Sequence, residues 1–239
     1  MEDLETHIAS YQPTPAAVEL VRQTDIVLLA GISGAGKDTI KRQLLQHPRF
    51  RDIVSHTTRA PRVNNNRAEE DGVDYHFIDM PTAERMVSQH EFIEAKFVHG
   101  TIYGTSVAEL EAIHDAGMIA ITDVDVQGVA EYEAMAPESV SIFLVPPDYD
   151  TWLTRLKSRY ATEEEFQAEW PKRRASSIKE LTHALTVPYY HVVINDDLER
   201  AVRVCREIIE RGDVFNRKDD EARLAARDLL DVLTSQAGA

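Results

Sequence analysis

The sequence predicts an α/β fold in which a parallel sheet is flanked by helices. Short apolar runs alternate with helical patterns along the chain, as expected when crossover helices connect parallel strands. The apolar runs are continuous, which is typical of strands covered on both faces. The chain has 239 residues, of which 43% are hydrophobic and 28% charged, enough for one large domain or one domain with insertions.

The predicted strands are five apolar runs separated by polar segments. They comprise residues 25–30, 53–56, 118–124, 140–145 and 190–194. The helices between them carry start and stop signals. Ser106 and Glu109 have the spacing of a capping box, and Gly117 is placed to end that helix. Asp197 is predicted to cap a later helix that Gly212 closes.

Three further regions interrupt the plain alternation. Residues 59–98 combine a polar, Asn-rich loop with short strand-like pieces and are expected to form a small subdomain that projects from the sheet. Residues 159–176 mix acids and bases and are expected to form a mobile cover. The ends, 1–24 and 213–239, are predicted to be helical, with Thr14-Pro15 as a cap and first turn. The C-terminal segment packs either on the core or on a second subunit of a homo-oligomer, and the sequence leaves both open.

The composition restricts the kinds of partner. Lys and Arg total 26 against 41 Asp and Glu, a net charge of −15 that repels nucleic acid and anionic lipid. Any phosphate site must therefore be a local basic pocket. The single cysteine, Cys205, excludes an internal disulfide and is expected in the core, and a metal is expected to be held by oxygen atoms. The acidic start and the lack of a long apolar run predict a cytoplasmic protein without a membrane partner.

A glycine-rich loop from Gly31 to Thr39 directly follows the first predicted strand and leads into a helical pattern. Strand, glycine-rich loop and helix form the context that a P-loop requires. Glycines let successive N–H groups point at one anion, and Lys37 supplies a charge for the β- and γ-phosphates. The loop residues predicted to bind ATP are Gly31, Ser33, Gly34, Ala35, Gly36, Lys37, Asp38 and Thr39.

Three acids are candidates for the metal and its surroundings. The residue after Lys37 is Asp38, where such loops normally have a Ser or Thr that ligates Mg²⁺. Asp38 either binds Mg²⁺ directly or through water, or leaves a hydroxyl role to Thr39; weakened or altered catalysis is a third alternative. Asp123 and Asp125 end a predicted strand, where an acid approaches the metal, and either acid is alternatively a helix cap.

Polar motifs for a phosphoryl acceptor follow in order along the chain. Arg59 and Arg62 lie three residues apart after a predicted strand and form a natural fork for a monophosphate. The motifs are Ser55–Arg62, Asp71–Phe77, Glu91–Glu94, Gly100–Ser106 and Asp123–Gly128. In this order they closely resemble guanylate kinases, P-loop enzymes that transfer a phosphoryl group from ATP to GMP. The resemblance extends from about Asp25 to Gly212.

The resemblance implies a P-loop NTPase fold at 25–212, with an inserted GMP-binding subdomain at about 57–106 and a lid at about 159–176. It implies that MgATP is the phosphoryl donor and that Asn195 belongs to a loop near the adenine. The residues implied at the transferring group are Lys37, Arg59, Arg159 and Arg173. Those implied at the acceptor phosphate are Arg59, Arg62, Tyr75 and Tyr103, and those implied at the guanine are Ser55, Glu94, Thr105 and Asp123.

Guanine chemistry agrees with these residue types. Guanine carries N1–H and N2 amino donors on one edge and O6 and N7 acceptors on another. Carboxylates such as Glu94 and Asp123 accept from the first edge, and hydroxyls such as Ser55 and Thr105 donate to the second. Adenine would place a lone pair against a carboxylate, so GMP is expected to be preferred strongly to AMP.

The sequence also departs from the family pattern. The loop before Tyr75 is longer than usual, which leaves open a displaced Tyr75 or an added Arg67. Ala95 stands where the family often has tryptophan, which thins the packing behind the neighbouring carboxylate. The long lid leaves the choice between Arg173 and Arg174 open.

Several acceptor residues have a simpler alternative when taken singly. Tyr75 and Tyr103 also fit ordinary partly buried tyrosines, and Glu94 fits a solvated strand face. Arg59 and Arg62 are alternatively paired with the acids that follow them, Glu69, Glu70 and Asp71. Two other functions stay open: a kinase for an acceptor of the ribose bisphosphate type, and a non-catalytic binding module of the same fold, although such modules tend to lose the P-loop.

Overall fold

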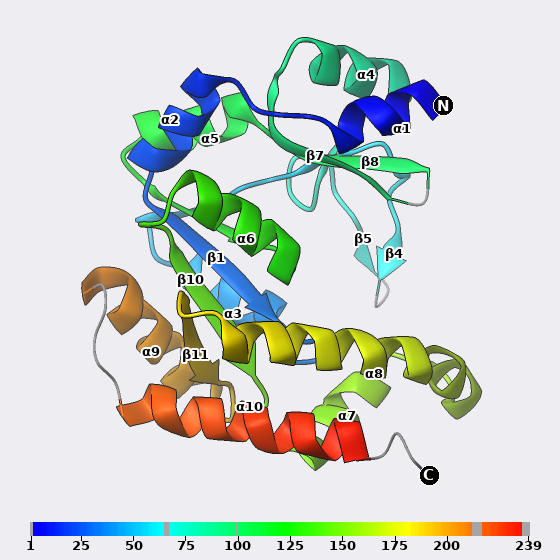
Figure 1. Cartoon of the computed structure of the whole chain (residues 1–239), viewed down its shortest axis with the longest axis vertical. Coiled ribbons are helices and arrows are strands. Elements are labelled where there is room, and N and C mark those ends of the chain that lie inside the picture. Colours follow the sequence, from blue (N-terminus) through cyan, green and yellow to red (C-terminus); the bar gives the residue numbers. More distant parts are fainter. Residues whose placement is uncertain (1, 65–66, 99, 212–216, 236–239) are drawn as a thin grey trace. The chain divides into compact units, whose positions relative to one another are not determined.

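The computed structural model describes residues 2–64, 67–98, 100–211 and 217–235 (Figure 1). The helices are α1 (Glu2–Ala9), α2 (Pro15–Gln23), α3 (Lys37–Leu44), α4 (Met80–Ser88), α5 (Val107–Asp115), α6 (Val126–Met135), α7 (Tyr149–Lys157), α8 (Glu163–Thr186), α9 (Leu198–Arg211) and α10 (Arg217–Ser235). The strands are β1 (Ile26–Gly31), β2 (Phe50–Asp52), β3 (His56–Thr57), β4 (Val63–Asn64), β5 (Arg67–Ala68), β6 (His76–Phe77), β7 (Phe92–Val98), β8 (Thr101–Ser106), β9 (Ile119–Asp123), β10 (Val140–Val145) and β11 (Tyr190–Ile194).

The chain divides into two compact units. Unit 1 contains Met1–Ile26, Arg49–Thr122 and Met135–Pro137. Unit 2 contains Val27–Pro48, Asp123–Ala134 and Glu138–Ala239.

The predicted parallel sheet is present. Its strand order is β11-β10-β1-β9-β2. In unit 2, β10 pairs in parallel with both β1 and β11, and in unit 1, β2 pairs in parallel with β9. The described strands match four of the five predicted runs closely, because continuous apolar runs bury side chains on both sheet faces.

The prediction of a strand at residues 53–56 is wrong. The structure has β2 before this run and β3 at its end. The Ile53 N–H donates to the Ile121 carbonyl at 2.9 Å and so continues the pairing with β9 by one bond. The Val54 N–H instead donates to the Glu109 carboxylate at 3.3 Å. The apolar run is therefore divided because a side chain replaces the neighbouring strand as hydrogen-bond partner.

The predicted helix caps at Thr14 and Asp197 are confirmed. The Thr14 hydroxyl accepts from the Ala17 N–H at 3.1 Å, and the Asp197 carboxylate accepts from the Arg200 N–H at 2.8 Å. Gly117 follows α5 with a φ of 62°. Gly212 lies outside the described residues, and Cys205 is fully buried, as predicted.

The predicted capping box at the start of α5 is only half present. The Ser106 hydroxyl accepts from the Glu109 N–H at 3.2 Å. The Glu109 carboxylate does not return to Ser106 and instead contacts Val54 and His76. Glu109 therefore connects α5 to the segment between β2 and β3.

A four-stranded sheet with order β6-β3-β8-β7 forms the centre of unit 1. The strand-like pieces predicted within 59–98 are present as β6 and β7, with α4 between them, whereas β4 and β5 lie in the segment predicted as a polar loop. One apolar cluster joins α1, α4, β7 and β8, with Ile8, Met86, Phe92 and Ile102 buried in it. The N-terminal helix α1 is thus packed into the core of unit 1 and lies along β7 and β8 in Figure 1.

In unit 2, the long helix α8 contains most of the segment predicted as a cover. Thr162 caps it by accepting from the Glu165 N–H at 3.2 Å, and Pro171 lies inside it. The C-terminal helix α10 packs along α8 and β11 (Figure 1), with Leu229 and Leu233 buried. Of the two alternatives for the C-terminal segment, packing on the core is therefore observed.

Among the described residues, no helix combines the length and apolar character needed to cross a bilayer.

Candidate functional site

The glycine-rich loop of unit 2 connects β1 to α3, and its backbone does not accommodate side chains at the glycine positions. Gly31, Gly34 and Gly36 have φ values of 144°, 88° and 93°. A Cβ atom on Gly31 would lie 2.4 Å from the Leu144 carbonyl oxygen. One on Gly36 would lie 2.2 Å from Nδ2 of Asn195. The loop therefore needs glycine for its backbone angles and for close approach of its neighbours.

Neighbouring elements hold the loop in place. The Trp152 indole on α7 donates to the Ser33 carbonyl at 2.8 Å. The buried Asn195 amide, which follows β11, donates to the Ala35 carbonyl at 2.8 Å. These bonds satisfy loop carbonyls and leave the loop preorganised before any ligand arrives.

Lys37 begins α3 and folds back over the loop. Its Nζ donates to the Gly31 carbonyl at 2.5 Å. Burial lowers the pKa of the Lys37 ammonium below its usual value, and the carboxylates of Glu180, Asp123 and Asp38 oppose this shift. Lys37 is therefore a cation partly removed from water and surrounded by acids.

A cavity of about 300 Å³ in unit 2 surrounds Lys37. Its lining combines the loop with acids and an arginine from other elements: Gly31, Ser33, Gly34, Gly36, Lys37, Asp38, Asp123, Val124, Asp125, Val126, Arg159 and Glu180. A second cavity of about 340 Å³ is lined by Gly34, Gly36, Thr39, Arg155, Arg159, Asn195, Asp196 and Leu198. The two cavities share Gly34, Gly36 and Arg159, so together they suit an elongated ligand.

The predicted metal residues differ in their surroundings. The Asp38 side chain is 65% exposed, and its Oδ2 lies 3.9 Å from Nη2 of Arg159. Arg159 also approaches the Ser33 hydroxyl at 3.4 Å. Asp125 accepts from the Gly128 N–H at 2.7 Å, which is the helix-cap alternative for this residue. Thr39 lines the second cavity rather than the one around Lys37.

Asp123 lies in the cavity around Lys37 and pairs with a residue that the sequence reasoning missed. Its Oδ1 is 2.5 Å from Nζ of Lys41, which lies one helical turn after Lys37 on α3. The spacing of four residues on a helix was the available signal for Lys41.

Glu180 is a second residue that the sequence reasoning missed. It lies on α8, seven residues after Arg173 and so on the same face of that helix. Burial raises the pKa of its carboxyl, and the positive charge of Lys37 opposes this shift. Only the tertiary structure shows that Glu180 lines this cavity.

Arg173 and Arg174, the two candidates for the predicted lid arginine, have different partners. Arg173 donates from Nε to the Tyr160 hydroxyl at 2.9 Å, and its Nη2 lies 3.7 Å from the Glu169 carboxylate. Arg174 donates to the Leu233 carbonyl of α10, from Nε at 2.8 Å and also from Nη2. Arg174 thus connects α8 to α10, and Arg173 is the member of the pair whose charge acts on Glu180.

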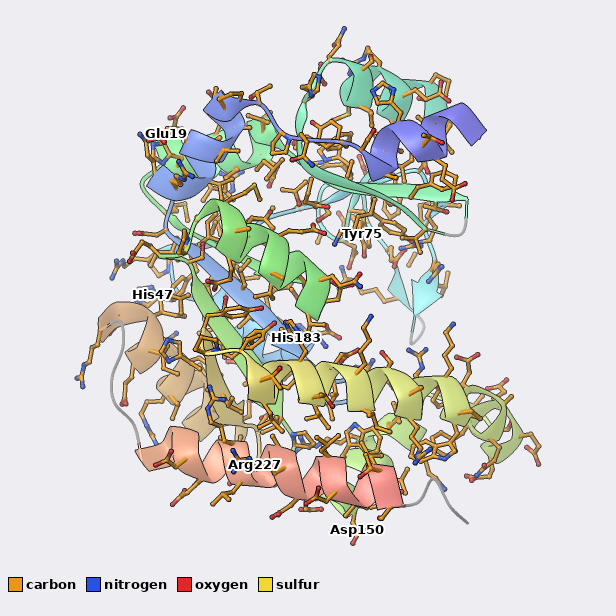
Figure 2. The ribbon with its side chains drawn as sticks, in the orientation of Figure 1. Glu19, His47, Tyr75, Asp150, His183 and Arg227 are labelled. Carbon is orange, nitrogen blue, oxygen red and sulfur yellow. The ribbon has the colours of Figure 1, made fainter. Side chains whose placement is uncertain are left out.

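In unit 1, Arg59 is held by a carboxylate and a ring. Its Nη1 and Nη2 donate to Glu69 at 2.8 and 3.0 Å, the pairing that the sequence left as an alternative. This pairing raises the pKa of Arg59 and lowers that of Glu69. The guanidinium also lies 5.2 Å from the ring centroid of Tyr75, labelled in Figure 2. Tyr103 in turn lies 6.1 Å from Tyr75, ring to ring.

Arg62 is placed differently from Arg59. Its side chain is exposed, and its backbone N–H donates to Glu69 at 2.8 Å. Arg67, on the longer loop, pairs with Asp74 at 2.9 Å. Glu69 therefore organises this loop around both arginines of the predicted fork.

Glu94 and Thr105 face each other across β7 and β8. They are register partners, and the Thr105 N–H donates to Glu94 Oε1 at 3.0 Å. Thr105 is buried, whereas Glu94 and Ser55 are half-buried. Ala95 packs against the apolar cluster of α1, α4, β7 and β8, where the family often has tryptophan. The structure thus gathers Arg59, Tyr75 and Tyr103 as one group and Glu94 with Thr105 as another, all in unit 1.

Comparisons with known proteins agree with this architecture. Residues 23–212 match the family model described as guanylate kinase. Guanylate kinase of Neisseria gonorrhoeae is 38% identical over 181 residues, which cover 75% of this chain and 84% of that protein. Guanylate kinase 1 of Oryza sativa subsp. japonica is 36% identical over 197 residues, which cover 81% of this chain but 50% of that protein.

A solved structure gives the same result. The crystal structure of guanylate kinase from Anaplasma phagocytophilum matches with a TM-score of 0.55 and 29% identity, over 78% of this chain and 85% of that one. The family model alone spans more than half of the chain. The chain therefore belongs to the guanylate kinase family.

Proposed function

We propose that this protein transfers the γ-phosphoryl group of MgATP to GMP, giving ADP and GDP. The observation that carries the proposal is the loop from Gly31 to Lys37. Its positions Gly31 and Gly36 have no room for a side chain, and its lysine lines a polar cavity. Family membership gives the reaction, and the described side chains supply groups suited to each part of it.

On the donor side, we assign the triphosphate to the loop and Lys37. Backbone N–H groups of the loop and the N-terminus of α3 favour anions, and Lys37 adds a full charge. The second cavity, which contains Asn195 and Thr39, is suited to the rest of the nucleotide. In this proposal residues 25–212 form the kinase domain, 159–176 its lid and 57–106 its GMP-binding subdomain.

Oxygen ligands near Lys37 fit a Mg²⁺ ion. Asp38 and Asp125 line the same cavity, and Asp38 is largely exposed, so its carboxylate is accessible to an ion on the phosphates. No cluster of three or more His, Cys, Asp or Glu side chains suited to a metal occurs in the part of the chain that the structure describes. Proteins usually hold Mg²⁺ through one or two carboxylates plus substrate phosphates, and Asp38 and Asp125 are the carboxylates proposed here. When bound, Mg²⁺ supplies neutralisation of phosphate charge.

On the acceptor side, Arg59 is the central candidate for the GMP phosphate. Its Nε–H is buried and has no hydrogen-bond partner among the described residues, so a donor is left for a ligand. Tyr75, Tyr103 and Arg62 complete the proposed phosphate site. Glu69 already fixes the guanidinium plane, which reduces the entropy lost when a phosphate binds.

For the base, we assign Glu94 and Thr105 to guanine together with Ser55 and Asp123. Glu94 accepts one backbone N–H through Oε1, and a carboxylate has further lone pairs that can accept from guanine N1–H and N2.

We assign Lys37, Arg59, Arg159 and Arg173 to the transferring phosphoryl group, where positioning and charge neutralisation dominate catalysis. We further propose that the protein works in the cytoplasm. A net charge of −15 opposes binding to nucleic acid, so we expect its substrates to be free nucleotides.

A coupled assay of ADP release with GMP, AMP, UMP and CMP tests the proposal. GMP should be the preferred acceptor, and Glu94→Gln should reduce the preference for GMP over AMP by about 100-fold, since the site would lose a carboxylate that accepts from guanine. Equal rates with all four nucleotides would refute the base assignment. Turnover of a ribose bisphosphate in place of GMP would instead support the alternative of a kinase for that type of acceptor.

A further inference from the structure

The N-terminal segment contacts a strand that carries a base-reading residue of the proposed function. Residues before position 23 lie outside the match to the guanylate kinase family. In this structure they are nonetheless part of unit 1, because Ile8 is buried with Met86 and Phe92, and Tyr11 packs against the same cluster. The segment is therefore in a position to affect β7.

The Tyr11 hydroxyl binds both backbone polar groups of one residue. It donates to the Phe92 carbonyl at 2.6 Å and accepts from the Phe92 N–H at 3.1 Å. β7 is the last strand in its sheet, so these groups of Phe92 lie on the side away from β8. Tyr11 thus acts there as a one-residue substitute for a neighbouring strand.

Phe92 lies at an irregularity in the strand pairing. Phe92 pairs with Ser106 and Glu94 with Thr105, so β7 advances two residues where β8 advances one. The extra residue, Ile93, is buried. Such a bulge re-aims the side chains that follow it, and here the next side chain is that of Glu94.

The turn before β7 is held by the same segment. His90 has a φ of 54°, unusual for a residue other than glycine. Its ring stacks on Tyr11 with 5.6 Å between centroids, and its Nδ1 lies 3.1 Å from the Gln12 carbonyl. The start of β7 is therefore fixed by Tyr11 and Gln12 at two successive points.

We infer that Tyr11 is a positioning residue for guanine recognition, which acts through Phe92 and the bulge at Ile93 to orient the Glu94 carboxylate. This inference rests on the proposed function of Glu94. Burial raises the pKa of the Tyr11 hydroxyl, and the negative charges of Glu94 and Glu91 add to that shift, so the hydroxyl stays protonated and keeps donating to Phe92 at neutral pH.

Steady-state kinetics of Tyr11→Phe test this inference, because the substitution removes the hydroxyl and keeps the ring that packs on the core. We expect KM for GMP to rise about fivefold to tenfold, as for a lost interaction of about 1 kcal/mol, with KM for ATP nearly unchanged and the melting temperature lower by only about 2–4 °C. Ser10→Ala is the matched control. Among the described residues, the Ser10 hydroxyl binds only the Thr6 and His7 carbonyls of the same segment, so the kinetics of Ser10→Ala should equal those of the unsubstituted chain.

A double-substitution cycle separates positioning from a general structural effect. In a Glu94→Gln background, Tyr11→Phe should add little to KM for GMP, because the carboxylate that it orients is gone. Additive effects, an equal rise of both KM values, or no rise at all would overturn the inference. Failure of the proposed function would look different, since the unsubstituted chain would then form no ADP in response to GMP.

Discussion

Replacing Gly36 by alanine tests the close contact between the glycine-rich loop and Asn195. Gly36 has a φ of 93°, and a Cβ atom there would lie 2.2 Å from Nδ2 of Asn195. The Asn195 amide cannot move away freely, because the same nitrogen donates to the Ala35 carbonyl at 2.8 Å and the residue is buried. The substitution therefore forces either a shift of the loop or the loss of this hydrogen bond.

The loss of folding free energy expected for Gly36→Ala has two parts. A residue with a side chain at this φ is strained by about 1–2 kcal/mol. Displacing Asn195 adds about 1–3 kcal/mol, because a buried amide loses its partner. The two parts together amount to about 2–5 kcal/mol, which corresponds to a fall in melting temperature of about 4–20 °C for a chain of this size.

Gly117→Ala is the matched control for the backbone part. Gly117 has a φ of 62°, but a Cβ there would have no atom within 4 Å, so only the strain of about 1–2 kcal/mol applies. Thermal unfolding of both variants, with KM for ATP measured in the coupled assay, gives the comparison. Gly36→Ala should also raise KM for ATP, whereas Gly117→Ala should not. Equal melting temperatures for the two variants, or an unchanged KM for ATP in Gly36→Ala, would refute the reasoning.

Two further predictions concern charge. Lys37→Ala should lower kcat for GMP phosphorylation by about 100- to 1000-fold with little effect on the free energy of unfolding. The reason is that Lys37 is proposed to stabilise the negative charge that develops on the phosphates in the transition state. A retained kcat in the coupled assay would contradict that role. Burial, together with the neighbouring His76, lowers the pKa of His56 from 6.5 to about 4. The unfolded chain therefore binds a proton as the pH falls through 6.5, while the folded chain does so only near pH 4. The contribution of His56 to the free energy of unfolding is therefore fully present above pH 6.5. It should decrease by about 1–2 kcal/mol between pH 6.5 and 4, a value discounted for the partial exposure of the ring. Urea unfolding at several pH values should show this decrease, and His56→Phe should flatten it; an unchanged pH dependence in that variant would rule out His56 as the cause.

Much of the fold was predictable because its signals are local. Continuous apolar runs gave β1, β9, β10 and β11, and the caps at Thr14, Ser106 and Asp197 need only a side chain and an N–H a few residues away. The strand prediction at 53–56 failed for a non-local reason, since Glu109 of α5 takes the Val54 N–H.

The candidate site was predictable only where its residues belong to one continuous sequence motif. The loop from Gly31 to Lys37 is such a motif, because strand, glycines and helix follow one another directly. Lys41 and Glu180 were missed, although each repeats a helical spacing from a predicted residue. The roles assigned to Asp38 and Asp125 in metal binding stay predictions.

By itself, the sequence determined the alternation of elements, the glycine-rich loop and the order of motifs that places the chain in its family. These features depend on residue types at short separations, where steric limits and hydrogen-bonding capacity act directly. The tertiary structure decided which side chains become partners across long separations. It assigned Arg174 to Leu233 and left Arg173 with Tyr160, paired Arg59 with Glu69, and brought Tyr11 against Phe92. Such choices depend on the packing of whole helices and strands, which no local pattern specifies.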